Sequence, residues 1–154
     1  MTGKVLAFQF DMNGRSTELN LEGVSHQDSL TQPAPGGNCV NWVIGHIVAN
    51  RNGVHKLLGL PPTWDAGTDR YDRDSVPITD SADAEPLDDL LDRLRSSQAA
   101  FAGALETIDE ARLTSAVDGG KPLGVQLAFL SFHESYHVGQ LGLLRRFLGR
   151  DRAI

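Results

Sequence analysis

The sequence predicts an all-α protein, a four-helix bundle, on three observations. Four stretches repeat apolar residues at helical spacing, and no two stretches pair convincingly as β-strands. Segments rich in Gly, Pro and Asp separate these stretches. The 154 residues, 40% of them hydrophobic, are enough to bury a core as one domain over residues 1–154. Four amphipathic helices in one domain favour a bundle.

The first predicted helix covers residues 4–24. Its helical spacing is carried by Val5, Phe8, Met12, Leu19 and Gly23. Part of the same stretch also alternates as a strand would, through Leu6, Phe8, Phe10 and Met12. Helix is the favoured interpretation.

The second predicted helix follows the breaker cluster TQPAPGG. Asn38 is the expected N-cap, and the helix ends near Gly59. One face carries Cys39, Val43, His46, Asn50, Val54 and Leu57. The next segment, residues 60–85, is rich in Pro and Asp and has no sustained period, so we expect a long loop that crosses over the bundle or covers a site.

Two further helices complete the bundle. The third begins at Pro86, and its apolar stripe consists of Leu87, Leu90, Leu91, Leu94, Phe101, Leu105 and Ile108. The fourth extends from Pro122 to Leu148, with Arg145, Arg146 and Gly149 marking its end. One of its faces carries Leu130, His133, His137, Leu141, Leu144 and Leu148.

The charge and cysteine content restrict the partners. A net charge of −6 and a pI near 5.2 argue against a nucleic acid or an anionic membrane surface, because both require a basic face. No apolar run is long enough for a membrane span. The single cysteine, Cys39, is expected to be a buried thiol, and the first residues lack the pattern of a signal peptide. We therefore expect a cytoplasmic protein that binds a small molecule.

Three histidines are candidate metal ligands. His133 and His137 are four residues apart, so their imidazoles share a helix face, and His46 occupies an equivalent inward position on the second helix. Each buried imidazole left without a partner would cost about 1–3 kcal/mol, which a shared divalent metal would avoid. Three histidines with an open fourth position are typical of catalytic zinc, and Ni²⁺ or Fe²⁺ would also suit them. The alternative is that these are core histidines hydrogen-bonded to neighbouring groups.

The pentapeptide HESYH also fits the HExxH pattern of zinc proteases. Those enzymes take a third ligand downstream, where this chain offers only Asp151 as a carboxylate and no histidine or cysteine. A protease is therefore disfavoured. Glu134 could act as a general base, or it could orient an imidazole or pair with Arg51 or Arg145. Gln140 and Asn50 could line the open metal position or satisfy other buried polar groups.

Other residues have simpler interpretations. Trp42 is expected to pack in the core beside the metal, one turn before His46. Two aromatic residues of the long loop, Trp64 and Tyr71, would either form a lid or anchor that loop. The remaining histidines, His26 and His55, are expected to be exposed.

The motifs NWVIGHI and HESYHVGQLGLLRRFLG together closely resemble the DinB-like superfamily, which includes bacillithiol S-transferase-like proteins and mycothiol-dependent maleylpyruvate isomerases. The resemblance covers nearly the whole chain. It implies that His46, His133 and His137 are the metal ligands, that residues 60–85 form a long crossover between the second and third helices, and that the protein is a homodimer.

Three functions remain open. In the first, the metal activates a low-molecular-weight thiol for S-transfer to an electrophile, with Glu134 and Gln140 as candidate catalytic residues. In the second, metal-bound water makes the protein a hydrolase. In the third, the metal only stabilises a non-enzymatic, stress-related protein, and a fourth protein ligand would favour this alternative.

Overall fold

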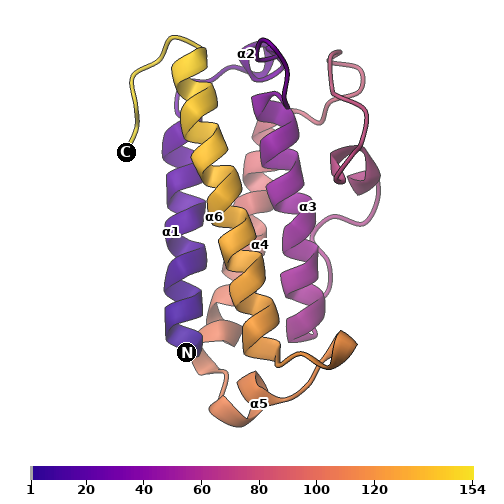
Figure 1. Ribbon diagram of the computed structural model, residues 1–154, viewed down its shortest axis with the longest axis vertical. Helices are drawn as coiled ribbons and strands as arrows, with labels where there is room; N and C mark the ends of the chain where they lie inside the picture. The colour runs from indigo at the N-terminus through magenta and orange to yellow at the C-terminus, as the bar shows by residue number, and fades with distance from the viewer. Residues whose placement is uncertain (1) are drawn as a thin grey trace.

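The computed structural model describes residues 2–154, apart from the side chain of residue 118. Four long helices form a bundle: α1 (Gly3–Leu21), α3 (Val40–Leu58), α4 (Leu87–Thr107) and α6 (Leu123–Phe147) (Figure 1). Shorter elements are α2 (His26–Ser29), α5 (Glu110–Thr114) and the 3₁₀ helices η1 (Thr68–Tyr71) and η2 (Asp118–Gly120). The described residues contain no β-strand, which confirms the predicted all-α bundle.

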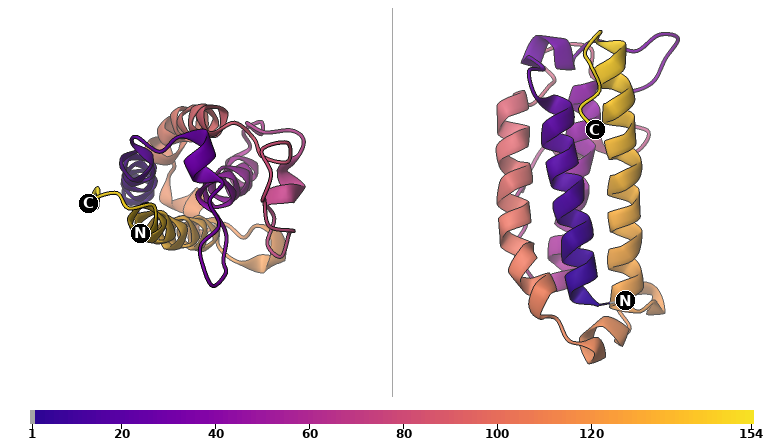
Figure 2. Two further views of the ribbon diagram at one scale, coloured as in Figure 1. Left: turned by 90° about the horizontal axis from the view of Figure 1, so that it is seen from above. Right: turned by 90° about the vertical axis from the view of Figure 1, so that its left-hand side faces the viewer.

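The helix order explains the long loop. Both α1 and α3 pack against α4 and α6, so α1 and α3 lie diagonally opposite each other (Figure 2). Two contacts show that α3 and α4 run in the same direction. Asn41 near the start of α3 donates to the carbonyl of Glu85 just before α4, and His55 near the end of α3 packs on Phe101 in the second half of α4. Parallel neighbours cannot be joined by a tight turn. Residues 59–86 therefore return along the side of the bundle, which confirms the predicted crossover (Figure 1).

The first helix is confirmed, but its buried face differs from the stripe that indicated it. Val5, Phe8, Met12 and Leu19 are between 43% and 63% exposed. The buried face instead carries Leu6, Phe10, Asn13, Thr17 and Asn20. Asn13 is tolerated there because its amide donates to the carbonyl of Ser131 on α6 at 3.1 Å, whereas Oγ1 of Thr17 and the amide nitrogen of Asn20 have no hydrogen-bond partner.

Two predictions on α3 are wrong. The N-cap is Cys39 rather than Asn38, and the Cys39 side chain caps no backbone N–H. The thiol is fully buried, as predicted, and its Sγ lies 3.6 Å from the carbonyl oxygen of Ile78 in the crossover. His55 is buried rather than exposed, because the last turn of α3 faces α4 and the Nδ1 of His55 lies 2.6 Å from the Pro61 carbonyl oxygen. His26 is half-buried. The predicted end of α3 is correct: Gly59 has φ 73°, a left-handed cap.

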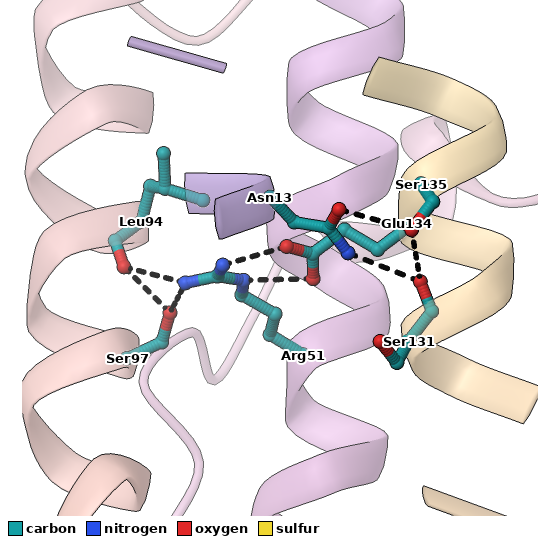
Figure 3. A network of polar contacts seen from close by, with 7 residues as sticks. All are labelled: Asn13, Arg51, Leu94, Ser97, Ser131, Glu134 and Ser135. Atoms are coloured by element: carbon teal, nitrogen blue, oxygen red, sulfur yellow. Dashed lines mark hydrogen bonds and ion pairs between the residues drawn. The ribbon is translucent and has the colours of Figure 1, made fainter. Parts of the chain in front are cut away.

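The core consists of two apolar clusters. One lies around the first half of α3 and includes Val43, Ile44, Leu90, Leu94 and Leu141. The other lies at the α5 end and includes Phe10, Val54, Phe101, Leu105 and Leu127. Buried Arg51, Ser97, Ser131 and Glu134 occupy the intermediate turns of α3, α4 and α6 and form a polar layer between the clusters (Figure 3).

None of the helices in the described part of the chain combines the length and apolar character that a bilayer span requires.

Candidate metal centre

Three imidazoles from two helices converge on one point. The Nε2 atom of His133 lies 3.4 Å from Nε2 of His46 and 3.2 Å from Nε2 of His137. His133 and His137 are on successive turns of α6, and the antiparallel packing of α3 against α6 places His46 opposite them. The available ligand atoms of all three residues lie within 4.8 Å of one another, so these residues could hold a metal ion.

The hydrogen bonds behind two of these rings determine which nitrogen carries the proton. Nδ1 of His46 lies 2.5 Å from the backbone carbonyl oxygen of Tyr71, and Nδ1 of His137 lies 2.7 Å from Oε1 of Gln140. Both oxygens can only accept, so each neutral ring carries its proton on Nδ1 and leaves a lone pair on Nε2. The Asn50 amide, 3.2 Å from Nε2 of His46, can donate to that lone pair, and a proton on Nε2 of His133 can satisfy the lone pair of His137. A cation between the rings would instead bind the Nε2 lone pairs of all three histidines.

The spacing also fits a metal. Zn–N bonds of about 2.0–2.1 Å at tetrahedral angles place two ligand nitrogens about 3.3 Å apart. The two Nε2 separations of 3.4 and 3.2 Å bracket that value. The donor set, three imidazoles each offering Nε2, therefore fits a divalent metal ion by both chemistry and distance.

Burial disfavours the charged form of His133 and His137. His46 and His137 are 6% and 7% exposed, whereas His133 is half-buried at the mouth of the site. Burial lowers the pKa of His137 to about 4, although its hydrogen bond to Gln140 partly opposes the shift. Burial also lowers the pKa of His133, and the neighbouring His46 lowers it further. At neutral pH His133 and His137 therefore need not release protons before they bind a cation.

His46 is held from several sides. The indole of Trp42, one turn earlier, stacks on the imidazole with ring centroids 4.7 Å apart and 12° between the planes, as predicted for core packing beside the site. The amide of Asn50, one turn later, donates to the carbonyl oxygen of His46 at 2.8 Å and lies 3.2 Å from Nε2. Asn50 therefore borders the point of convergence and also bonds a buried neighbour, so it meets both alternatives that the sequence left open.

The crossover is anchored beside the site by Tyr71, whose side chain is fully buried. Its hydroxyl donates to Oδ1 of Asn41 at 3.0 Å and accepts from the backbone N–H of Glu85 at 2.8 Å. Burial raises the pKa of this phenol to about 12. Trp64 is also buried and packs near Tyr71, so both aromatic residues anchor the loop. The carbonyl of Tyr71 could not be found from the sequence, because a backbone oxygen carries no residue signal.

The histidines open into a cleft of about 760 Å³, a volume suited to a small molecule. Its lining comes from α3, the crossover and α6: Trp42, His46, Asn50, Asp72, Arg73, Phe129, Leu130, His133, Tyr136 and His137. Among the described residues, no other His, Cys, Asp or Glu joins the three histidines. A metal held there would keep a position open toward the cleft.

The two residues considered for catalysis lie elsewhere. Oxygens of the Glu134 carboxylate accept from Nε and Nη2 of Arg51 at 3.0 and 2.7 Å, which is one of the partners considered from the sequence. The amide oxygen of Gln140 accepts a hydrogen bond from Nδ1 of His137. Neither residue lines the cleft. The structure thus brings together His46, His133 and His137, and places Glu134 and Gln140 behind them.

The fold and the convergent imidazoles define a helical bundle with a possible three-histidine metal site. A sequence model of the DinB superfamily matches residues 9–141, and the chain belongs to this superfamily. A crystal structure of a conserved protein from Enterococcus faecalis has the same fold, with a TM-score of 0.75, 21% identity, and coverage of 96% of this chain and 98% of that one. A comparison with curated proteins found no match.

Proposed function

We propose that this protein is a metal-dependent S-transferase, in which His46, His133 and His137 bind a divalent ion that activates a low-molecular-weight thiol. The observation that carries the proposal is the convergence of the Nε2 atoms at the base of an open cleft. Structural zinc sites have four protein ligands, whereas catalytic sites have three and an open position. The absence of a fourth candidate ligand among the described residues supports a catalytic role over a purely stabilising one.

The chemistry needs few protein groups. When bound, the metal would lower the pKa of a thiol at the open position. The sulfur would then form a bond to an electrophilic carbon, the leaving group would depart with its bonding electrons, and the thiol proton would pass to water in the cleft. The aromatic rings of Phe129 and Tyr136, both 59% exposed, offer an apolar wall for the electrophile.

Imidazole nitrogen suits Zn²⁺, Ni²⁺ and Fe²⁺, and we propose Zn²⁺ or Ni²⁺ as the first metals to test. Gln140 is proposed as a residue that orients His137, because its amide oxygen fixes the ring proton on Nδ1. A cytoplasmic location is proposed because the only cysteine, Cys39, is free and buried, so the fold uses no internal disulfide.

We also propose that the protein forms a homodimer through α6. Outside the cleft, the helix exposes four large apolar side chains on one face: Val125, Phe132, Leu143 and Phe147. From Val125 to Leu143 the only charged residue is Glu134, which is buried. An uncharged apolar row of this kind favours a protein partner over water. Light scattering should show a dimer for the wild type and a monomer for Phe132→Glu; a monomeric wild type would contradict the proposal.

The test of function begins with metal content. Protein prepared without chelator or nickel resin should contain close to one metal ion per chain, and His46→Ala should contain far less. The loaded wild type should then join thiols to electrophiles in a coupled screen, with no turnover after chelation or in His46→Ala. Ester or amide hydrolysis without any thiol would instead support the hydrolase, and a wild type that binds no metal after reconstitution would end both enzymatic proposals.

A further inference from the structure

A buried ion pair lies directly behind the histidine site. Arg51 of α3 and Glu134 of α6 are joined by two parallel hydrogen bonds of 3.0 and 2.7 Å, and their side chains are 1% and 5% exposed. The remaining terminal nitrogen of Arg51 donates to the carbonyl of Leu94 at 2.9 Å and to Oγ of Ser97 at 3.0 Å, both on α4 (Figure 3). One guanidinium therefore connects three helices.

The remaining long helix, α1, also contributes to this polar layer. Asn13 of α1 donates to the carbonyl of Ser131 at 3.1 Å and accepts from Oγ of Ser135 at 2.9 Å, and these residues flank Glu134 on α6 (Figure 3). All four long helices thus have a polar contact at one level of the bundle. These contacts are directional, in contrast to the apolar clusters on either side.

The ion pair occupies the turns that carry the candidate ligands. Glu134 directly follows His133, and Arg51 follows His46 by five residues and Asn50 by one. Adjacent residues on a helix point in different directions, so His133 faces the cleft while Glu134 faces the core. The bidentate pair fixes the α3 turn that follows His46 against the α6 turn that carries His133 and Glu134.

A metal site needs such precision. One residue of helix shift moves a side chain by about 1.5 Å, which is large compared with metal–nitrogen bonds of about 2.0–2.1 Å. Apolar contacts between α3 and α6 would allow the helices to slide and rotate slightly against each other. Two parallel hydrogen bonds fix both the position along the helix axis and the rotation. Replacing a buried ion pair by apolar residues is often neutral for stability, so stability alone does not account for this pair.

We propose that Arg51 and Glu134 are positioning residues that set the separation of His46 from His133 and His137, and so the affinity and geometry of the metal site. The proposal rests on metal binding as proposed above. Neither residue would touch the metal or the substrate, and both would act through the helix turns that they connect.

The test uses Co²⁺ as the probe, because its visible absorption reports the coordination geometry. The wild type is titrated first, and absence of binding there would be a failure of the metal site itself. The main variant, Arg51→Met with Glu134→Leu, removes both charges together; Ser97 still donates to the Leu94 carbonyl at 2.8 Å, so its hydroxyl is not left unpaired. We expect a folded protein whose Co²⁺ affinity is lower by about 10- to 100-fold and whose absorption bands are shifted.

Two controls separate positioning from general damage. Glu18→Leu with Arg95→Met removes an exposed ion pair between α1 and α4 and should leave Co²⁺ affinity and spectrum unchanged. Leu6→Ala destabilises the apolar cluster at the α5 end without touching the ion pair, and should lower the unfolding midpoint with an unchanged spectrum. If the main variant does not fold, Arg51→Lys, which keeps the charge but loses the fork, is expected to show the same spectral shift.

Wild-type affinity and an unshifted spectrum in a folded variant of the pair would overturn the proposal. It would also be overturned if no variant of the pair folds, since the pair would then serve folding itself.

Discussion

The aromatic ring of Tyr71 rests directly on the backbone of Gly45. A methyl group added to Gly45 would lie 2.1 Å from a ring carbon, far closer than any real contact. Gly45 immediately precedes His46, and the backbone carbonyl of Tyr71 is the partner of Nδ1 of that histidine. Because residue 45 has no side chain, the crossover can approach α3 closely enough for the carbonyl of Tyr71 to orient the imidazole of His46.

Gly45→Ala should therefore weaken both the fold and the site. Overpacking of this kind costs about 1–3 kcal/mol, and displacement of Tyr71 would remove the acceptor behind His46. Urea unfolding and a metal titration measure the two effects. Gly53→Ala on the same helix is the matched control, because its new methyl would meet Leu130 at an ordinary 3.6 Å. That variant should gain up to about 1 kcal/mol from helix propensity, and equal behaviour of the two would contradict this account.

Gln140→Leu should lower metal affinity with little effect on the fold. The variant removes the oxygen that accepts from Nδ1 of His137 at 2.7 Å, so the imidazole is free to rotate or change tautomer. Loss of such a partner typically lowers metal affinity by about 10- to 100-fold. Competition with a chelating dye measures the metal affinity of each variant. Gln140→Glu retains an acceptor and should retain affinity, whereas equal losses in both variants would show that the hydrogen bond is irrelevant.

Stability of the metal-free protein should fall as the pH falls from about 6.5 toward 4. The pKa of His137 is lowered from its ordinary 6.5 to about 4 by burial, so in this window the unfolded chain takes up a proton that the folded chain does not. Above pH 6.5 the ring is neutral in both states and contributes no slope. The free energy of unfolding is measured in urea at pH 7.5, 6.5, 5.5 and 4.5. It should fall more steeply with decreasing pH for the wild type than for His137→Gln, and identical slopes would show that His137 is not the cause.

Tyr71→Phe should destabilise the fold by about 1–3 kcal/mol, because Oδ1 of Asn41 and the N–H of Glu85 lose their partner in a buried setting. Metal binding in the folded variant should persist, since the oxygen beside His46 belongs to the backbone. Thermal unfolding and metal content measure the two quantities. Tyr136→Phe, at a 59% exposed position, should change stability by less than about 0.5 kcal/mol.

Periodicity was a sound guide to helices but a weaker guide to faces. The stripe of α1 that indicated a helix is exposed, because the bundle buries the opposite, more polar face, where Asn13 bonds to α6. Local patterns report where a helix can form, and the burial of a polar face depends on partners that a single segment does not contain. His55 was misplaced for the same reason: its partner, the Pro61 carbonyl, belongs to the crossover.

The sequence by itself determined the helical class, the long crossover and the three histidines, because helical period, breaker residues and the four-residue spacing of imidazoles are local properties of the chain. Tertiary structure alone decided how those histidines are held. The Tyr71 carbonyl behind His46 and the Arg51–Glu134 pair connect residues 25 and 83 positions apart. Such contacts arise only when the crossover lies along α3 and α6 packs against it, since hydrogen bonds form between atoms brought within about 3 Å, whatever their separation in sequence.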